Sequence, residues 1–302
     1  MKTLYIDCSM GAAGDMLTAA LLELLPEEKQ AEFIEKMNNL GIPGVSVEKT
    51  TVSKCGINGT HVKVLVNGEE EGEFMLHHHH EEEHEHSHEH DHHEHHHHEH
   101  EETCEHHEHS HEHHHDHEHD EEHSHHYHEH THSHHGMHDI EHIVNGHLDI
   151  PENVKHDVMA VYNLIAEAES NAHGKPIDEI HFHEVGTMDA VADVTAVCLL
   201  IDMIKPEKIV ASPVHVGSGT VHCAHGILPV PAPATAFILK GIPIYGGKIK
   251  SELCTPTGAA LLKHFVSEFG DMPIIKTEKI GYGMGYKDFE QANCVRVFLG
   301  EA

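Results

Sequence analysis

Segment 77–138 limits what this chain can fold into more than any other feature. It holds 33 of the 44 histidines, interleaved with Asp and Glu and without a single Lys or Arg. Almost no apolar side chain is present there to offset the entropy that a chain loses on folding. We therefore expect residues 69–138 to be disordered, and the fold to be built from the residues on either side.

The same histidines offer many ligands to divalent metal ions. Imidazole suits nickel, zinc and copper, and the neighbouring carboxylates neutralise the charge of the ion. All three metals would bind, so selection among them is left to the folded part of the chain. Protons compete for imidazole near neutral pH, and mild acid should release the metal. The densest runs, which we predict as ligands, are His77, His78, His79, His80, His95, His96, His97, His98, His113, His114 and His115.

The charge of the chain is also concentrated in this tract. Residues 69–138 contain 23 of the 52 acidic residues, so the formal net charge of −34 falls to −11 over the rest. Such a balance repels nucleic acid and anionic lipid. No stretch approaches the roughly 20 apolar residues of a membrane span, no signal peptide follows Met1, and the seven cysteines form no CxxC pair. We expect a cytoplasmic protein without nucleic-acid or membrane partners, and its oligomeric state stays open.

Periodicity predicts an α/β (α+β) fold, with mixed sheets and flanking helices interrupted by the long disordered His-rich insertion. A small α/β segment is expected over 1–68, and an α/β domain that completes the core over 139–302. The predicted strands are 3–7, 45–53, 60–66, 208–213, 220–230, 274–281 and 294–299, with a hairpin turn at 55–59. The predicted helices are one ending at 25 and those at 27–40, 151–173, 188–204, 233–239 and 258–268.

A glycine-bearing turn with Gly11 and Gly14 joins the first strand to the first helix. Free N–H groups at such a helix start commonly hold phosphate. Asp7 and Asp15 would repel a bare phosphate, so either a cation bridges them or Asp15 simply caps the helix. The Lys of a P-loop is missing, which argues against a nucleotide hydrolase.

Segment 181–193 groups two histidines with carboxylates. His181 and His183 point the same way on an extended chain, whereas Glu184 points opposite unless the chain turns. Asp189 and Asp193 are four residues apart, which places both carboxylates on one helix face. These residue types predict a metal or substrate site. A capping cluster with solvated histidines is the alternative.

A third group of candidates lies around residues 217–219. His215, His222, Cys223 and His225 could add soft ligands, but their spacing matches no common zinc pattern, and surface loop residues would look the same.

Two further positions belong to turn-like motifs. Thr257 is available as a helix cap and hydroxyl donor in the turn at 254–258. Gly283 is the middle of three alternating glycines at 281–285, where the backbone could approach a ligand closely or make a tight turn.

Taken together, these motifs resemble one family, the nickel insertion proteins of nickel-pincer cofactor biosynthesis (the LarC family). The resemblance runs in order from residue 3 to about 300. It is carried by DCSMGAAGDM at 7–16, the His-rich insertion, HFHEVGTMD at 181–189, CTPTGAA at 254–260 and GYGMG at 281–285.

The resemblance implies CTP-dependent cyclometallation. Nickel is placed into pyridinium-3,5-bisthiocarboxylic acid mononucleotide with nickel–carbon and nickel–sulfur bonds, and the product is the cofactor of lactate racemase, whose apoprotein is an expected partner. Family members continue into a C-terminal part that binds CTP with Mn²⁺ or Mg²⁺, whereas this chain stops at Ala302. We expect that nucleotide-binding part to be a separate or frameshifted product.

This chemistry requires a nickel source, a pocket for a phosphorylated pyridinium and a base for the proton displaced from the ring carbon. The tract could supply nickel, the group at 181–193 could hold it, and His183 or Glu184 could be the base. The turn at Gly11 and Gly14 could hold the phosphate. A nickel storage protein or metallochaperone, or a zinc-handling regulator or transporter accessory, remains an alternative.

Overall fold

A computed structural model describes residues 1–70, 136–182, 185–223 and 225–302. Most of the predicted disordered tract, including its metal-ligand runs, lies outside these described residues, as do His183 and Glu184. The disorder prediction was too long at both ends. Residues 69–70 pair with a neighbouring strand, and a helix that the sequence analysis missed begins at residue 137, because an apolar face recurs there at helical spacing.

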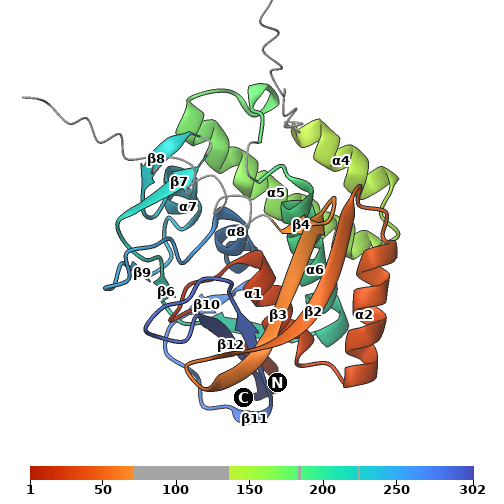
Figure 1. The fold of residues 1–302 in the computed structure, drawn as a ribbon, viewed down its shortest axis with the longest axis vertical. Helices are drawn as coiled ribbons and strands as arrows, with labels where there is room; N and C mark the ends of the chain where they lie inside the picture. Colours follow the sequence, from red (N-terminus) through yellow and green to blue (C-terminus); the bar gives the residue numbers. More distant parts are fainter. Residues whose placement is uncertain (71–135, 183–184, 224) are drawn as a thin grey trace, which may run out of the picture. The chain divides into compact units, whose positions relative to one another are not determined.

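One mixed sheet organises the described residues (Figure 1). Its eight strands run in the order β10-β5-β1-β12-β11-β3-β2, and β4 pairs with β3. The bounds are β1 Lys2–Asp7, β2 Val45–Lys54, β3 Ile57–Val66, β4 Glu69–Glu70, β5 Lys208–Ala211, β10 Glu268–Phe269, β11 Lys276–Met284 and β12 Cys294–Glu301. The first strand lies between parallel β5 and antiparallel β12, with Leu4 opposite both Ile209 and Leu299. Strands from both sides of the tract therefore share one sheet, and the predicted mixed α/β class is confirmed.

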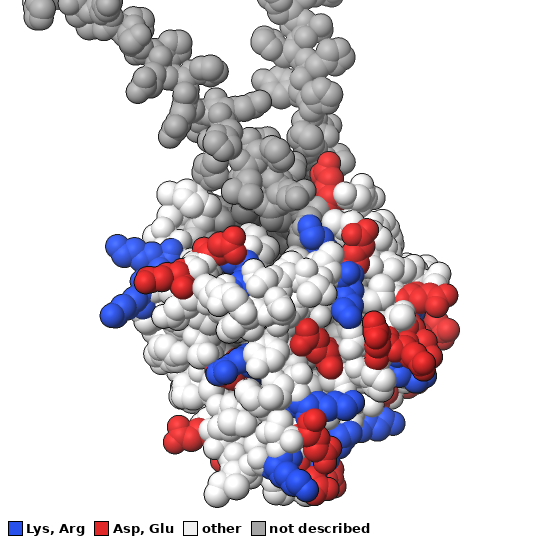
Figure 2. All heavy atoms as spheres, turned by 60° about the horizontal axis from the view of Figure 1, so that its bottom comes forward, with Lys and Arg blue, Asp and Glu red and all other residues white. Residues whose placement is uncertain are grey.

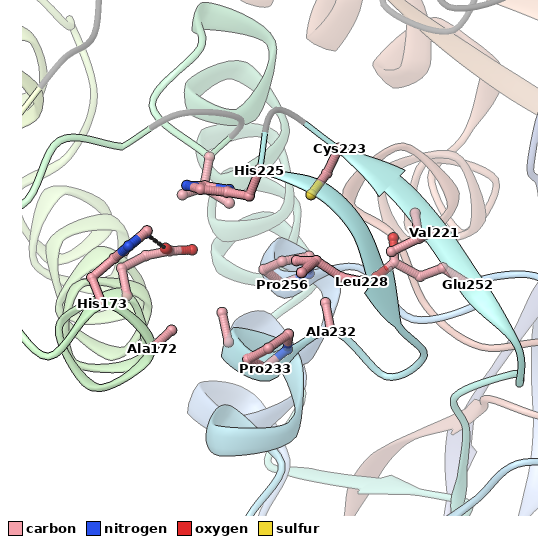
Figure 3. Close-up of a pocket in the computed structure, with 13 residues that line it drawn as sticks. Ala172, His173, Val221, Cys223, His225, Leu228, Ala232, Pro233, Glu252 and Pro256 are labelled. Atoms are coloured by element: carbon pink, nitrogen blue, oxygen red, sulfur yellow. Dashed lines mark ion pairs between the residues drawn. The ribbon is translucent and has the colours of Figure 1, made fainter. Parts of the chain in front are cut away.

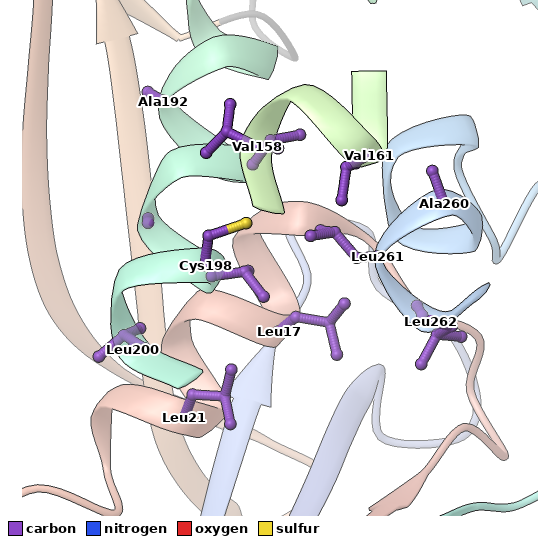
Figure 4. Close-up of a cluster of buried hydrophobic side chains, with 14 of the residues drawn as sticks. Leu17, Leu21, Val158, Val161, Ala192, Cys198, Leu200, Ala260, Leu261 and Leu262 are labelled. Atoms are coloured by element: carbon purple, nitrogen blue, oxygen red, sulfur yellow. The ribbon is translucent and has the colours of Figure 1, made fainter. Parts of the chain in front are cut away.

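Helices pack against this sheet and against one another. They are α1 Gly14–Leu22, α2 Glu27–Asn39, α4 Met137–Gly146, α5 Glu152–His173, α6 Met188–Ile204, α7 Pro233–Ile238 and α8 Pro256–Phe265, with a 3₁₀ turn at Ile177–Glu179. Side chains of α1, α5, α6 and α8 meet in the buried cluster of Figure 4, which includes Leu17, Val158, Cys198 and Leu261. Helix α6 is apolar nearly all round, as expected for a helix covered on every side. No described helix is long and apolar enough to cross a membrane.

The predictions for α2, α5, α6 and α7 are confirmed to within a residue or two. Helix α8 instead ends at Phe265, and the last predicted helical residue, Glu268, lies in β10. Residues 220–230 form no single strand but the hairpin of β7 Thr220–Cys223 and β8 Gly226–Pro229. A second small sheet pairs β6 Val214–His215 with β9 Ile244–Tyr245.

The turn between β2 and β3 was also placed wrongly. Cys55 and Gly56, with φ of 51° and 78°, form the two-residue turn, and the Asn58-Gly59 pair that suggested it lies inside β3. Positive φ at both central positions is the hallmark of a type I′ hairpin. Gly59 has another reason to be glycine, because a Cβ there would lie 2.7 Å from the carbonyl oxygen of Tyr282.

Candidate functional site

The glycine turn between β1 and α1 packs against the segment that precedes α8. Ala12 N–H donates to Leu253 O (3.0 Å), and Thr255 N–H donates to Ala12 O (3.1 Å). Gly11 has a φ of 84°, and a Cβ on it would overlap Leu253 O. Gly11 N–H donates to Cys8 O (2.9 Å). The N–H groups of Gly11 and Ala12, which were expected to be free for a phosphate, therefore bond to backbone carbonyls.

Asp7 is held by protein partners at the end of β1. Its carboxylate accepts hydrogen bonds from Ser9 N–H (3.0 Å) and Arg296 Nε (2.9 Å), and Arg296 Nη2 also contacts it. The side chain is 11% exposed. An arginine thus compensates this charge, and the structure does not require a cation at Asp7.

Helix α1 begins at Gly14, and the residue before it, Ala13, provides no side-chain cap. Asp15 lies in the first turn and Ala13 is the N-cap, so the alternative in which Asp15 is the cap residue is not the arrangement observed. Instead, this turn faces the start of α6. A Cβ on Gly14 would lie 2.5 Å from Asp193 Oδ2, so glycine is what allows the close approach.

Three carboxylates meet at this junction, and we call Asp15, Asp189 and Asp193 the acidic cluster. Burial raises the pKa of Asp193 well above its ordinary value of 3.8, and repulsion by Asp15 and Asp189 raises it further, against the stabilising backbone N–H of Asp15. Asp193 Oδ1 is shielded from solvent and has no hydrogen-bond partner among the described residues, although the residue as a whole is only half-buried. A carboxyl group in this setting favours its protonated form.

Tyr162 on α5 belongs to the same region, and the sequence analysis missed it. The side chain is fully buried, its ring lies 6.0 Å from that of Phe182, and its hydroxyl has no hydrogen-bond partner among the described residues. Burial raises its pKa well above 10.0, and the charges of Asp189 and Asp193 raise it further. The only sign of it in the sequence was a tyrosine, with its polar hydroxyl, on the apolar face of a helix. An unsatisfied buried group of this kind calls for a water or a ligand.

The other predicted residues of segment 181–193 do not join this group in the described structure. His181 is exposed, and His183 and Glu184 lie outside the described residues. Within the ranges that the structure describes, no three His, Cys, Asp or Glu side chains are arranged to hold a metal ion.

A cavity of about 220 Å³ opens beside the β7–β8 hairpin, and we call it the hairpin cavity (Figure 3). His173 and Glu169 enter it from α5, Cys223 and His225 from the hairpin, and Glu252 from the segment before α8. The remaining lining is apolar. Glu169 and His173 were not predicted, and the available signal was their spacing of four residues at the end of a helix.

The third group of candidates is divided between two locations. Cys223 and His225 line the hairpin cavity, whereas His222 points away from it and is exposed. His215 is buried, and its ring nitrogens lie 2.8 Å from Ser9 O and 3.0 Å from Gly246 O. Tyr245 stacks on its ring, so His215 connects the glycine turn to a neighbouring loop.

Thr257 and Gly283 have packing roles. The cap of α8 is Thr255, whose hydroxyl accepts from Gly258 N–H (3.2 Å), and Thr257 bonds to that hydroxyl instead of capping the helix. A Cβ on Gly283 would overlap Met16 O, and one on Gly281 would overlap Ala20 O. The backbone that these alternating glycines approach is therefore that of α1. The segment at 281–285 is largely strand β11 and not a tight turn.

Charges of both signs are interspersed over the face shown in Figure 2, with an uncharged area between them. This face of the folded part shows both signs of charge, whereas residues 77–138 contain acidic residues and no Lys or Arg.

Comparison with known proteins gives a consistent result. The profile of the family described as nickel insertion protein matches residues 4–302. A pyridinium-3,5-bisthiocarboxylic acid mononucleotide nickel insertion protein from Clostridium kluyveri is 39% identical over all of this chain and 62% of its own length. The protein of the same name from Clostridium acetobutylicum is 41% identical over all of this chain and 64% of its own length. A third, from Desulfitobacterium hafniense, is 44% identical over 52% of this chain and 39% of its own length.

No solved structure matches the chain. The chain spans slightly less than two thirds of the length of the two clostridial relatives. The family match nevertheless extends over the strands, the acidic cluster and the hairpin cavity alike, and the predicted resemblance is confirmed. The chain belongs to the nickel insertion protein family.

Proposed function

We propose that this chain performs the metal-handling part of nickel insertion into pyridinium-3,5-bisthiocarboxylic acid mononucleotide, the substrate in the names of its relatives. The observation that carries the proposal is the meeting of Asp15, Asp189 and Asp193 near the buried hydroxyl of Tyr162, which has no hydrogen-bond partner among the described residues. Groups with strongly shifted pKa values, gathered from two distant motifs, are typical of functional sites. Repulsion among the carboxylates is relieved when Asp193 takes up a proton.

The cluster fits the proton chemistry that insertion requires. When the nickel–carbon bond forms, the ring carbon releases a proton, and this proton needs an acceptor. A base works best when its pKa lies near the working pH, and an ordinary aspartate is far too acidic for that. Asp193, whose carboxyl is held beside Asp15 and Asp189, is our candidate for the base, because its raised pKa makes the ionised form a stronger proton acceptor than an ordinary aspartate. His183 and Glu184, the bases predicted from sequence, stay predictions.

The nucleotide, the reaction class and the recipient of the cofactor are inferred from the resemblance to the family. CTP, with Mn²⁺ or Mg²⁺, would be used by a C-terminal part, and insertion would be a lyase-type, CTP-dependent reaction in the cytoplasm. The finished cofactor would pass to lactate racemase. The relatives support the need for a further part, since about a third of their length lies outside the match.

The test is an insertion assay with the chain, a C-terminal part from a relative, CTP, substrate and Ni²⁺. Asp193→Asn should lower the rate at least about a hundredfold, as expected when a general base is lost. Tyr162→Phe should lower it less. Asp202→Asn is the matched control, because Asp202 lies at the far end of the same helix and bonds to Asn153.

Unchanged insertion in Asp193→Asn would refute the assignment of the base. A storage protein or metallochaperone is the second candidate, and the 33 histidines of the tract favour it. In that case the chain would bind several Ni²⁺ ions and the complemented mixture would form no nickel–carbon product.

A further inference from the structure

We propose that the hairpin cavity is a docking site for a borderline divalent metal ion of the Ni²⁺ class, with His173, His225 and Cys223 as ligands. Imidazole and thiolate together suit such ions, and this ligand set differs from the carboxylates of the acidic cluster. Metal binding at this site can be tested without substrate. The role of the bound ion as nickel awaiting insertion rests on the proposed function.

The three ligands approach from two separate elements. The rings of His173 and His225 lie 4.8 Å apart between centroids, tilted by 47°. Cys223 lines the same cavity two residues before His225, and its thiol donates a hydrogen bond to Gly226 O (3.4 Å). Figure 3 shows these side chains around one opening, with α5 on one side and the hairpin on the other.

Glu169 gives the site an outer ligand shell. Its carboxylate lies 3.4 Å from His173 Nε2, one helical turn away on α5. Histidines that bind metals commonly bond through the other ring nitrogen to a carboxylate, which fixes the ring and raises its basicity. Coordination would then use His173 Nδ1. Glu252 adds a second carboxylate to the lining, and the pair favours a cation over an anion.

The described side chains do not yet chelate in this conformation. Metal–nitrogen bonds of about 2.0–2.1 Å and metal–sulfur bonds of about 2.3 Å require the hairpin residues to move toward α5. The hairpin is a two-stranded element outside the main sheet, so it can shift without breaking the core. As the metal–sulfur bond forms, the Cys223 thiol loses its proton to solvent, and the ion keeps water in its open positions.

The position of the cavity favours transfer to the acidic cluster. Val185 lines the cavity and lies four residues before Asp189, at the start of α6. Glu252 and Pro256 also line it, and the residues between them pack against the glycine turn that leads to Asp15. The cavity is thus lined by the segment that leads into α6 and by the segment that packs against the glycine turn, next to the two helix starts that carry the carboxylates.

The experiment uses the full chain and an anaerobic titration with Ni²⁺ alone. Charge-transfer absorption from thiolate to nickel reports only cysteine-bound metal, so the many histidines of the tract do not contribute. The reference is the variant C55S/C104S, which removes the exposed Cys55 and the cysteine of the tract. We expect the reference to show the band and Cys223→Ser in that background to lose it.

Further variants in the same background test the remaining ligands. His173→Ala and His225→Ala should each weaken the titration at least tenfold, and Glu169→Gln about tenfold, as expected for an outer-shell partner. His222→Ala is the matched control, being the same residue type on the same hairpin outside the cavity, and should change nothing. The proposed site would be refuted if the band is absent in the reference or persists in Cys223→Ser. It would also be refuted if neither histidine variant changes the titration. Because Asp193→Asn should keep the band while losing insertion, failure of the proposed function can be distinguished from failure of this site.

Discussion

The acidic cluster and the hairpin cavity are built in opposite ways. The cluster lies where two core helices meet so closely that only glycine fits at position 14. The cavity is lined by one core helix, two helix starts and a small hairpin that pairs with no other strand of the described residues. A site embedded in the core holds its charges in place at a cost in stability, whereas a site on a peripheral hairpin can adjust its ligands. The first suits proton transfer and the second suits capture of a metal ion.

The largest expected effect tests how closely strand β11 packs against helix α1 in the core. Gly283→Ala would push a methyl group into Met16 O, so we expect the free energy of unfolding to fall by about 4 kcal/mol or more. Gly270→Ala is the control, because nothing lies within 4 Å of the Cβ it would add. Urea denaturation measures both, and equal stabilities would mean that β11 and α1 are less closely packed than described.

A second test concerns the buried charge of the cluster. The folded state holds the Asp193 proton more tightly than the unfolded chain, so stability falls as pH rises from about 4 toward the raised folded pKa. Asp193→Asn cannot ionise and should be more stable than the parent by about 1–2 kcal/mol at pH 8, with no difference at pH 3. Denaturation at a series of pH values shows this, with the exposed Asp178→Asn as control. If the stability of Asp193→Asn and that of the parent depend on pH in the same way, ionisation of Asp193 does not destabilise the folded state.

A third test separates metal supply from metal use. Deleting 77–135 retains Gly136, whose N–H donates to the Asp139 carboxylate at the start of α4 (2.9 Å). Long loops add little closure entropy, so the fold should persist. We expect about a tenfold loss of insertion at limiting Ni²⁺ and almost none at saturation, because tethered sites raise the effective concentration. The same loss at every Ni²⁺ concentration would give the tract a catalytic or structural role.

The smallest expected effect concerns the helix start that borders the cavity. Thr255→Ala removes the hydroxyl that caps α8 and should cost about 1 kcal/mol, whereas Thr255→Ser keeps it and should cost less. If the Ala variant also weakens nickel binding in the cavity, then metal binding there depends on the packing of the α8 start, and the hairpin cavity is less independent of the core than described above.

Local periodicity was sufficient to predict much of the fold. Helix α5 carries apolar residues at every third or fourth position, α6 is apolar nearly all round, and β12 has a compact apolar run, so their bounds were nearly right. The pairing of Asp189 with Asp193 followed from helical spacing alone. Local signals of this kind also misled, as in the Asn58-Gly59 pair, because a glycine can be required by a neighbouring backbone as well as by a turn.

The meeting of distant groups could not be predicted in this way. Asp15 and Asp193 approach only because α1 and α6 pack together, and no periodic pattern encodes which helices become neighbours. The same holds for Tyr162, whose unsatisfied hydroxyl is visible only once its surroundings are known. The alternating glycines at 281–285 were interpreted as room for a ligand or as a tight turn, because the sequence does not say which backbone they approach.

The central position of β1 affects the order in which the protein can be assembled during synthesis. Its two neighbours in the sheet begin at Lys208 and Cys294, so β1 has no partner from either neighbour until about 200 further residues have been made. At typical elongation rates this takes roughly 10–40 s. Once residues 69–138 have been made, the nascent chain also carries the many acidic residues of the tract, whose charge should keep the growing chain from aggregating.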